Sequence, residues 1–101
     1  MTVSSHLATN GTELTISISG RFDFSEHQAF RETYEAAPAT VQTYRIDMSD
    51  ATYLDSSALG MLLLLRDFAG GDSADINIVN CNTDVKKILT ISNFGQLFHL
   101  A

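Results

Sequence analysis

One short segment, residues 53–60, carries the side chains whose types and spacing could do chemistry. Asp55, Ser56 and Ser57 stand directly before an apolar run that reaches Leu65. Aspartate and serine cap helices because their side-chain oxygens accept the unpaired N–H groups of the first turn. A helix N-terminus also carries partial positive charge and tolerates a phosphate. The segment predicts a helix that opens at the two serines, and two interpretations stay open: a plain helix cap, or a serine that is phosphorylated.

The apolar run after the serines exceeds what one buried helix face needs. Leu59 and residues 61–65 leave no polar face for about two turns. In a chain of 101 residues, little protein remains to cover a second face. The alternative is a central helix that is buried on both sides. A phosphorylatable serine beside surplus apolar surface indicates a protein-binding face with a charge switch.

Other kinds of chemistry find little support in the sequence. His6, His27 and His99 are widely separated and form no ligand-spaced pair, so no metal site is predicted. Ser56 lacks the G-x-S-x-G pattern of a hydrolase nucleophile, and residues 70–71 lack the flanking pattern of a phosphate-binding loop. We therefore expect no enzyme activity, no cofactor and no metal.

Composition narrows the possible partners and the compartment. The formal net charge is −6, which disfavours binding to nucleic acid or to an anionic membrane and favours a basic groove on a protein partner. The single cysteine, Cys81, fits a reducing cytoplasm. The longest apolar run is far below the roughly 20 residues that span a bilayer. We expect a cytoplasmic protein with one domain over residues 1–101.

Periodicity places the elements that must position the segment. Alternating apolar residues and the Asn10-Gly11 turn signal predict an N-terminal hairpin, followed by strand–helix alternation. Gly20 is expected to leave the sheet, and Ser25 with Gln28 reads as a capping box. We predict an α/β fold with a mixed sheet of about four or five strands and about three or four packed helices. The expected strands are 3–7, 14–19, 41–48, 75–79 and 97–100, and the expected helices are 25–37, 56–69 and 83–92.

The segment from Asp55 to Gly60 resembles the D-S-[ST]-[GA]-L-G signature of STAS domains, in particular the bacterial anti-sigma factor antagonists. Three flanking segments agree with it. Residues 20–23 resemble the G-x-[LIF]-D segment of the family, residues 44–48 its third strand, and residues 93–98 its closing segment. The resemblance covers essentially the whole chain in order. Ala58 is a mild departure, because many members have glycine there.

The resemblance implies a STAS-type fold and a partner-switching function. In that family the unphosphorylated form binds an anti-sigma factor or a GHKL-type serine kinase. Phosphorylation of the serine directly after the signature aspartate, here Ser56, ends the binding, and a PP2C-like phosphatase restores it. Ser57 is the weaker candidate because it is the second hydroxyl. We expect the free protein to be a monomer or a weak dimer.

The predicted partner face combines the acidic residues, the serines and the start of the apolar helix. Its residues are Asp23, Asp55, Ser56, Ser57, Leu59, Met61 and Leu62. Arg21 lies next to Asp23, in the segment that resembles the loop flanking the family's phosphorylation site. A contact of Arg21 with the partner or with the phosphate is therefore a further hypothesis.

Two other functions stay open. In the first, the same switch serves a non-sigma output, such as biofilm or motility, through a response-regulator kinase/phosphatase. In the second, the domain is a constitutive small-ligand or complex-assembly module, like the STAS subunits of lipid transport or nucleotide-binding STAS domains. The second hypothesis predicts that replacing Ser56 by aspartate has no effect on binding.

Overall fold

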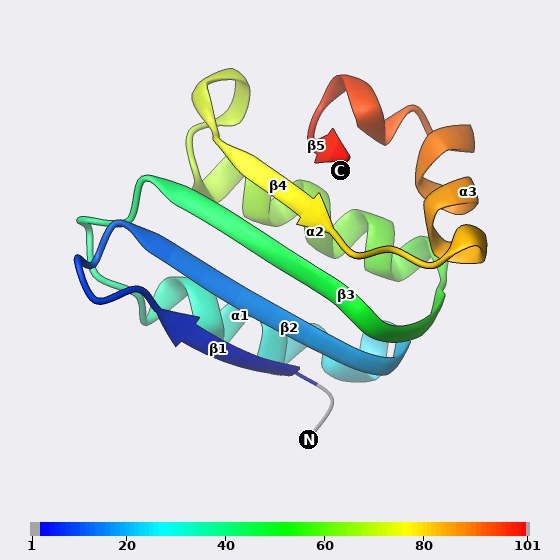
Figure 1. Ribbon diagram of the computed structural model, residues 1–101, viewed down its shortest axis with the longest axis horizontal. Coiled ribbons are helices and arrows are strands. Elements are labelled where there is room, and N and C mark those ends of the chain that lie inside the picture. The colour runs from blue at the N-terminus through cyan, green and yellow to red at the C-terminus, as the bar shows by residue number, and fades with distance from the viewer. Residues whose placement is uncertain (1–2, 101) are drawn as a thin grey trace.

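A five-stranded mixed sheet, with its strands in sequence order, forms the frame of the molecule (Figure 1). The computed structural model describes residues 3–100. The first two strands are antiparallel, and each later strand is parallel to the one before it. This arrangement confirms the predicted α/β fold. The strands are β1 (Val3–Leu7), β2 (Glu13–Phe22), β3 (Thr43–Leu54), β4 (Ile76–Val79) and β5 (His99–Leu100).

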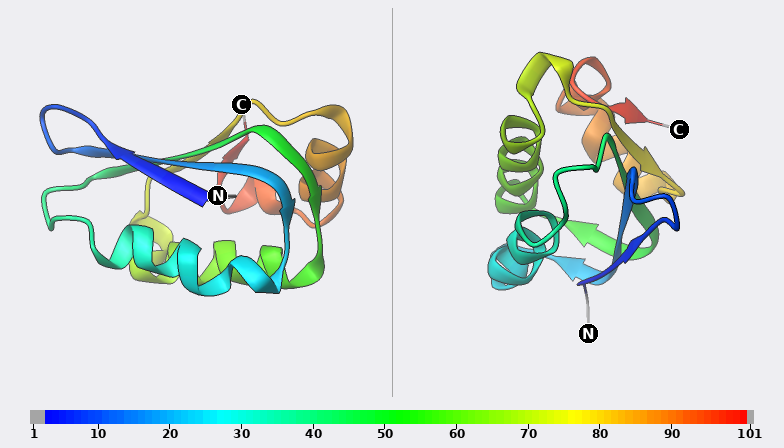
Figure 2. Two further views of the ribbon diagram at one scale, coloured as in Figure 1. Left: turned by 90° about the horizontal axis from the view of Figure 1, so that it is seen from below. Right: turned by 90° about the vertical axis from the view of Figure 1, so that its left-hand side faces the viewer.

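Helices cover one side of this sheet. Figure 2 shows α1 and α2 side by side below the sheet, while α3 packs against β3. The opposite face carries partly exposed polar residues such as Thr15, Ser17 and Arg45. The helices are α1 (His27–Glu35), α2 (Ser56–Phe68) and α3 (Thr83–Ile91), and the 3-10 segments are η1 (Phe24–Glu26), η2 (Gly71–Ser73) and η3 (Phe94–Gln96).

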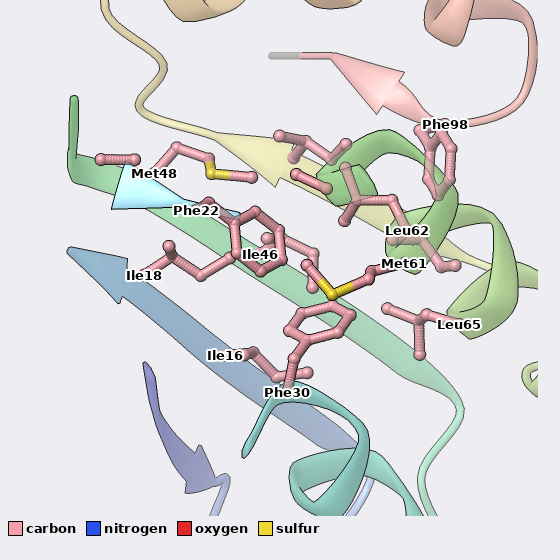
Figure 3. Close-up of a cluster of buried hydrophobic side chains, with 14 of the residues drawn as sticks. Ile16, Ile18, Phe22, Phe30, Ile46, Met48, Met61, Leu62, Leu65 and Phe98 are labelled. Atoms are coloured by element: carbon pink, nitrogen blue, oxygen red, sulfur yellow. The ribbon is translucent and has the colours of Figure 1, made fainter. Parts of the chain in front are cut away.

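The core lies between the sheet and the helices. Alternate residues of β2 and β3 point toward the helix layer, because successive side chains of a strand face opposite sides. They meet apolar residues of α1 and α2 and exclude water almost completely (Figure 3). Labelled members of this cluster are Ile16, Ile18, Phe22, Phe30, Ile46, Met48, Met61, Leu62, Leu65 and Phe98.

The hairpin between β1 and β2 turns where the sequence predicts it. Gly11 has a φ of +74°, a conformation that side chains rarely adopt. The side-chain oxygen of Asn10 accepts a hydrogen bond from the backbone N–H of Thr12 at 3.1 Å. A Cβ on Gly11 would lie 3.3 Å from Oγ1 of Thr40, so both the backbone conformation and the close neighbour favour glycine.

Both central strands run further than the sequence predicts. The expected strand at 41–48 continues to Leu54, so residues 49–54 are the second half of β3 where the sequence predicts a loop into the next helix, and β2 continues beyond Gly20 to Phe22. The pairing shifts register between Ser17 and Ser19 and again between Gly20 and Arg21. Such irregularities break the two-residue alternation by which strands are recognised. In this part of β3 the buried residues are three apart: Met48, Ala51 and Leu54.

The helix starts also differ in detail from the prediction. The Ser25–Gln28 capping box is wrong: Asp23 caps η1, accepting from the Ser25 backbone N–H at 3.0 Å, and α1 begins at His27. The second helix begins at Ser56 as predicted, and of the two expected capping residues, Asp55 and Ser56, Asp55 is the cap. Asn82 caps α3 and accepts from the backbone N–H of Val85 at 2.8 Å.

Two leucines of α2 provide a direct test of this packing. Leu62 is 0% exposed and Leu64 is 50% exposed. We expect Leu62→Ala to lower the free energy of unfolding by about 2–5 kcal/mol, because it removes buried contacts and leaves a cavity. Leu64→Ala should change it by about 0.5 kcal/mol or less. Urea unfolding of both variants measures the difference, and equal losses would contradict the orientation of α2.

Asp47 lies on the face of β3 opposite the helices, and its carboxylate makes the free energy of unfolding depend on pH. Its pKa lies below the ordinary value of 3.8, because the carboxylate accepts hydrogen bonds from the Ser49 backbone N–H at 2.9 Å and from the Asn80 amide at 3.2 Å. The ionised form therefore stabilises the fold above the unfolded-state pKa, and this stabilisation is lost as pH falls through the lower folded-state pKa.

We therefore expect the free energy of unfolding of Asp47→Asn to fall less steeply than that of the parent protein as the pH is lowered. The measurement is urea unfolding at neutral pH and at steps below pH 3.8. Asp50→Asn, an exposed position on the same strand, is the matched control and should keep the parent's acid dependence. Parallel curves for the parent and Asp47→Asn would contradict the assignment.

Candidate protein-interaction site

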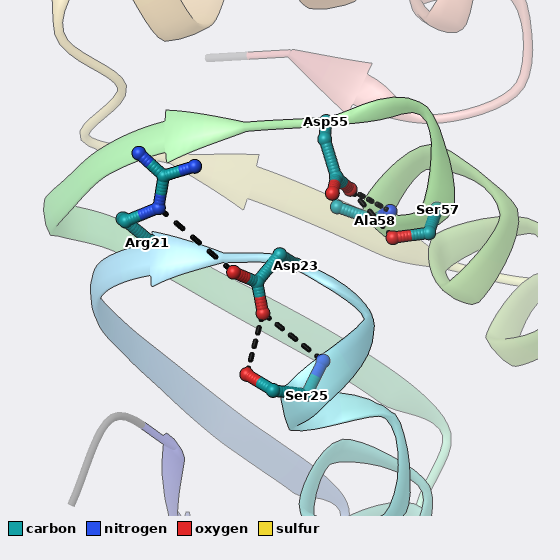
Figure 4. A network of polar contacts seen from close by, with 6 residues as sticks. All are labelled: Arg21, Asp23, Ser25, Asp55, Ser57 and Ala58. Atoms are coloured by element: carbon teal, nitrogen blue, oxygen red, sulfur yellow. Dashed lines mark hydrogen bonds and ion pairs between the residues drawn. The ribbon is translucent and has the colours of Figure 1, made fainter.

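The predicted acidic residues meet at one edge of the sheet. Asp23 directly follows β2 and Asp55 directly follows β3. The two strands are parallel neighbours, and their last paired residues are Arg21 with Tyr53 and Phe22 with Leu54. Residues that are distant in sequence therefore lie together beside the start of α2 (Figure 4).

Asp55 fixes the start of α2 through its carboxylate. One carboxylate oxygen accepts from the hydroxyl of Ser57 at 2.6 Å and from the backbone N–H of Ala58 at 2.9 Å. These two hydrogen bonds lower the pKa of Asp55 from its ordinary value of 3.8, and the charge of Arg21 adds to the effect. Asp55 is therefore a carboxylate at neutral pH.

The two adjacent serines are not equivalent. The Ser57 side chain is partly buried and donates to Asp55, so its hydroxyl is committed to the helix cap. Ser56 is the first residue of α2 and is exposed. Within residues 3–100, the Ser56 hydroxyl makes no hydrogen bond. Of the two, only Ser56 combines an accessible hydroxyl with freedom from the cap.

Arg21 and two aromatic side chains extend the site beyond the predicted residues. The Arg21 guanidinium lies 4.4 Å from the centre of the Tyr53 ring, and its Nε lies 3.9 Å from Oδ2 of Asp23. Tyr53 is 40% exposed and Phe24, which stacks on His27, is 67% exposed. Sequence reasoning missed Tyr53 and Phe24 as surface residues. The signal available in the sequence was that Phe24 follows Asp23 and that Tyr53 lies two positions before Asp55.

The apolar face of α2 is rotated from the one predicted. Met61 and Leu62 are buried in the core, so the prediction that they contact a partner is wrong. Leu59 is partly buried against the same core. The exposed apolar side chains are Leu63 and Leu64, one helical turn or more beyond Ser56, with Phe68 further along. We call Ser56, Leu63, Leu64 and Phe68 the outer face of α2.

The remaining candidate chemistry lies away from this edge. Among the described residues, no group of three or more histidine, cysteine, aspartate or glutamate side chains is arranged to hold a metal ion. Cys81 is half-buried, and burial raises the pKa of its thiol. In the part of the chain that the structure describes, no helix is long and apolar enough to cross a membrane.

Solved structures share this fold at low sequence identity. The unphosphorylated anti-sigma factor antagonist SpoIIAA is 19% identical and matches with a TM-score of 0.82, covering 98% of this chain and 87% of that chain. The phosphorylated Bacillus SpoIIAA is 16% identical, with a TM-score of 0.67 and coverages of 98% and 90%. A sulfate transporter family protein from Wolinella succinogenes is 12% identical, with a TM-score of 0.73 and coverages of 93% and 80%. These matches establish the fold.

Sequence comparison establishes the family. The family model described as "Mlab, STAS domain" matches residues 5–100. A STAS-domain containing protein from Pseudomonas aeruginosa (strain UCBPP-PA14) is 55% identical over 101 residues, which are the whole of both chains. Together with the five-stranded mixed sheet and the D-S-S-A-L-G segment at the start of α2, these matches show that the chain belongs to the STAS domain family.

Proposed function

We propose that this protein is a phosphorylation-controlled protein-interaction switch, with Ser56 as the phosphorylated residue. The observation that carries the proposal is the exposed, uncommitted hydroxyl of Ser56, the first residue of α2, directly after the capping Asp55. Its neighbour Ser57 is held by the cap. The switch is a regulatory device and involves no catalysis by this chain.

A phosphate on Ser56 would act on binding and leave the fold intact. It adds about −1.5 to −2 charges at neutral pH, at a helix N-terminus that favours negative charge. The phosphate would stand beside Asp55 on the outer face of α2. A partner that covers this face would have to bury an unpaired charge, which costs several kcal/mol. A loss of about 3 kcal/mol already weakens binding by more than a hundredfold.

The proposed partner is an anti-sigma factor or a GHKL-type serine kinase in the cytoplasm, with a PP2C-like phosphatase restoring the unphosphorylated form. The fold shared with SpoIIAA, whose unphosphorylated and phosphorylated structures both match this chain, supports that class. The formal net charge of −6 favours a basic surface on the partner. The same switch serves equally well for a non-sigma output, such as biofilm or motility, and the identity of the bound protein distinguishes the two.

The alternative function is a constitutive assembly module, in which binding is not switched by phosphorylation. The fold match to a sulfate transporter family protein shows that this fold also occurs in that setting. In such a module Ser56 would be only the first residue of α2, and its charge state would not control assembly.

A comparative pull-down from the native cell tests the proposal. The parent protein, Ser56→Ala and Ser56→Asp serve as baits, and the bound proteins are identified by mass spectrometry. We expect Ser56→Ala to retain a partner that Ser56→Asp loses, because the added carboxylate places a charge where the parent protein has a neutral hydroxyl. Incubation of the purified partner with ATP should phosphorylate the parent protein if that partner is the kinase.

Ser57→Ala is the matched control for these experiments. It removes the neighbouring hydroxyl and leaves Ser56, so phosphorylation should persist. Because the Ser57 hydroxyl belongs to the helix cap, urea unfolding checks that this variant remains folded. Equal recovery of the same proteins by the parent, Ser56→Ala and Ser56→Asp would refute the switch and favour the assembly module.

The outer face of α2 can be tested separately from the phosphate. We expect Leu63→Ser and Leu64→Ser each to weaken partner binding by about fivefold or more, because both side chains are exposed on the helix that begins at Ser56 and an interface residue of this kind contributes about 1 kcal/mol or more. Ile91→Ser, at a side chain that is 71% exposed on α3, is the control and should bind normally. Binding is measured by calorimetry, and urea unfolding confirms that the variants remain folded.

A further inference from the structure

Arg21 is an exposed cation with two weak contacts near the start of α2. Its side chain is 67% exposed, so packing does not fix its position. The 3.9 Å separation between its Nε and Oδ2 of Asp23 is too long for a hydrogen bond. The other carboxylate oxygen of Asp23 is already occupied by the backbone N–H and the hydroxyl of Ser25. The remaining contact of Arg21 is its stacking over the Tyr53 ring at 4.4 Å.

The strand pairing places Arg21 at the sheet edge where α2 begins. Arg21 and Tyr53 are register partners at the end of the β2–β3 ladder, and Ser56 follows Tyr53 by three positions. The guanidinium lies close enough to Asp55 for its charge to contribute to the lowered pKa of that carboxylate. Asp55 itself uses its hydrogen-bonding oxygen on Ser57 and Ala58. Arg21 therefore lies near Asp55, the residue before the proposed phosphorylation site, without being needed for the helix cap.

Several other cations of the described chain are engaged elsewhere. Arg66 pairs with Asp72 at 2.9 Å at the far end of α2, and Arg31 pairs with Glu35 at 2.8 Å on α1. Arg45 lies within the β2–β3 ladder, paired with Thr15, well before the strand end that carries Tyr53. Arg21 is thus the cation that the β2–β3 register brings to Tyr53 and Asp55.

We propose that Arg21 is the intramolecular ligand of a phosphate on Ser56, and that it leaves Tyr53 and Asp23 when it binds that phosphate. The inference rests on the proposed function for the position of the phosphate. A guanidinium presents a planar fork of donors that matches two phosphate oxygens, and a phosphate carries more charge than the Asp23 carboxylate. The new contact is therefore stronger than the two that it replaces.

This exchange would give phosphorylation a second effect on the partner face. In the unphosphorylated protein Arg21 covers one side of the Tyr53 ring and lies beside Asp23. Once Arg21 turns to the phosphate, the ring and the carboxylate are uncovered. Phosphorylation would then change both the charge at Ser56 and the shape of the surface at Tyr53.

The test places phosphoserine at position 56 during synthesis, by suppression of an amber codon, so that it needs no kinase. The phosphorylated parent, Arg21→Gln and Arg31→Gln are titrated by phosphorus NMR. We expect the second pKa of the phosphate to be lower by about one unit in the parent and in Arg31→Gln than in Arg21→Gln, because a nearby cation favours the dianion. Arg31→Gln makes the same change of charge on α1 and controls for net charge.

Proton NMR of the Tyr53 ring tests whether Arg21 moves. Ring signals should shift between the unphosphorylated and phosphorylated parent, and this shift should be much smaller in the Arg21→Gln pair. Equal phosphate pKa values in all three proteins, or a Tyr53 ring that is unaffected by phosphorylation, would overturn the proposal. Because phosphoserine is installed genetically, these results are independent of whether the cell phosphorylates Ser56, which the pull-down decides.

Discussion

The parallel pairing of β2 with β3 is the constraint on which the rest of the structure depends. This pairing forms the central ladder of the sheet. The buried side chains of β2 and β3 belong to the core against which α1 and α2 pack. The pairing continues through two register shifts, to Arg21 with Tyr53 and Phe22 with Leu54. Without this extension the two strands would end earlier, and Asp23 and Asp55 would not meet at one edge.

A second constraint follows where β3 ends and α2 begins. The carboxylate of Asp55 must accept hydrogen bonds from the first turn, and it takes the Ser57 hydroxyl together with the Ala58 N–H. Ser56 and Ser57 are chemically alike, but only Ser57 donates a hydrogen bond to Asp55. One becomes part of the cap, and the other is left at the surface with its hydroxyl available. A local hydrogen bond thus selects the residue on which the proposed regulation acts.

Much of this arrangement could be predicted from the sequence, because local signals are strong where hydrogen bonding is local. The Asn10-Gly11 turn, the alternating Leu14, Ile16 and Ile18, and the start of α2 are all local patterns, and each agrees with the structure. The family resemblance of residues 55–60 was confirmed by sequence comparison.

What could not be predicted depends on contacts between distant segments. The second half of β3 lacks two-residue alternation because the register shifts against β2 change which side chains face the core. In α2 every residue from Met61 to Leu65 is apolar, so the pattern carries no information about rotation. Only packing against the sheet decides that Met61, Leu62 and Leu65 are buried while Leu63 and Leu64 are exposed. The stacking of Arg21 on Tyr53 is likewise a consequence of strand register.

The surroundings of Ser56 have a consequence for how an enzyme can recognise this residue. Arg21, near the end of β2, and Asp23, which directly follows β2, lie at the sheet edge where α2 begins, although both precede Ser56 by more than thirty positions in the chain. A linear peptide copied from the Ser56 segment would carry the hydroxyl without these neighbours and without the ordered first turn of a helix. The proposed acceptor is therefore a conformational epitope. A kinase that recognises these neighbours as well as the proposed Ser56 acceptor would have to dock on the folded domain, and an unfolded chain would not present them.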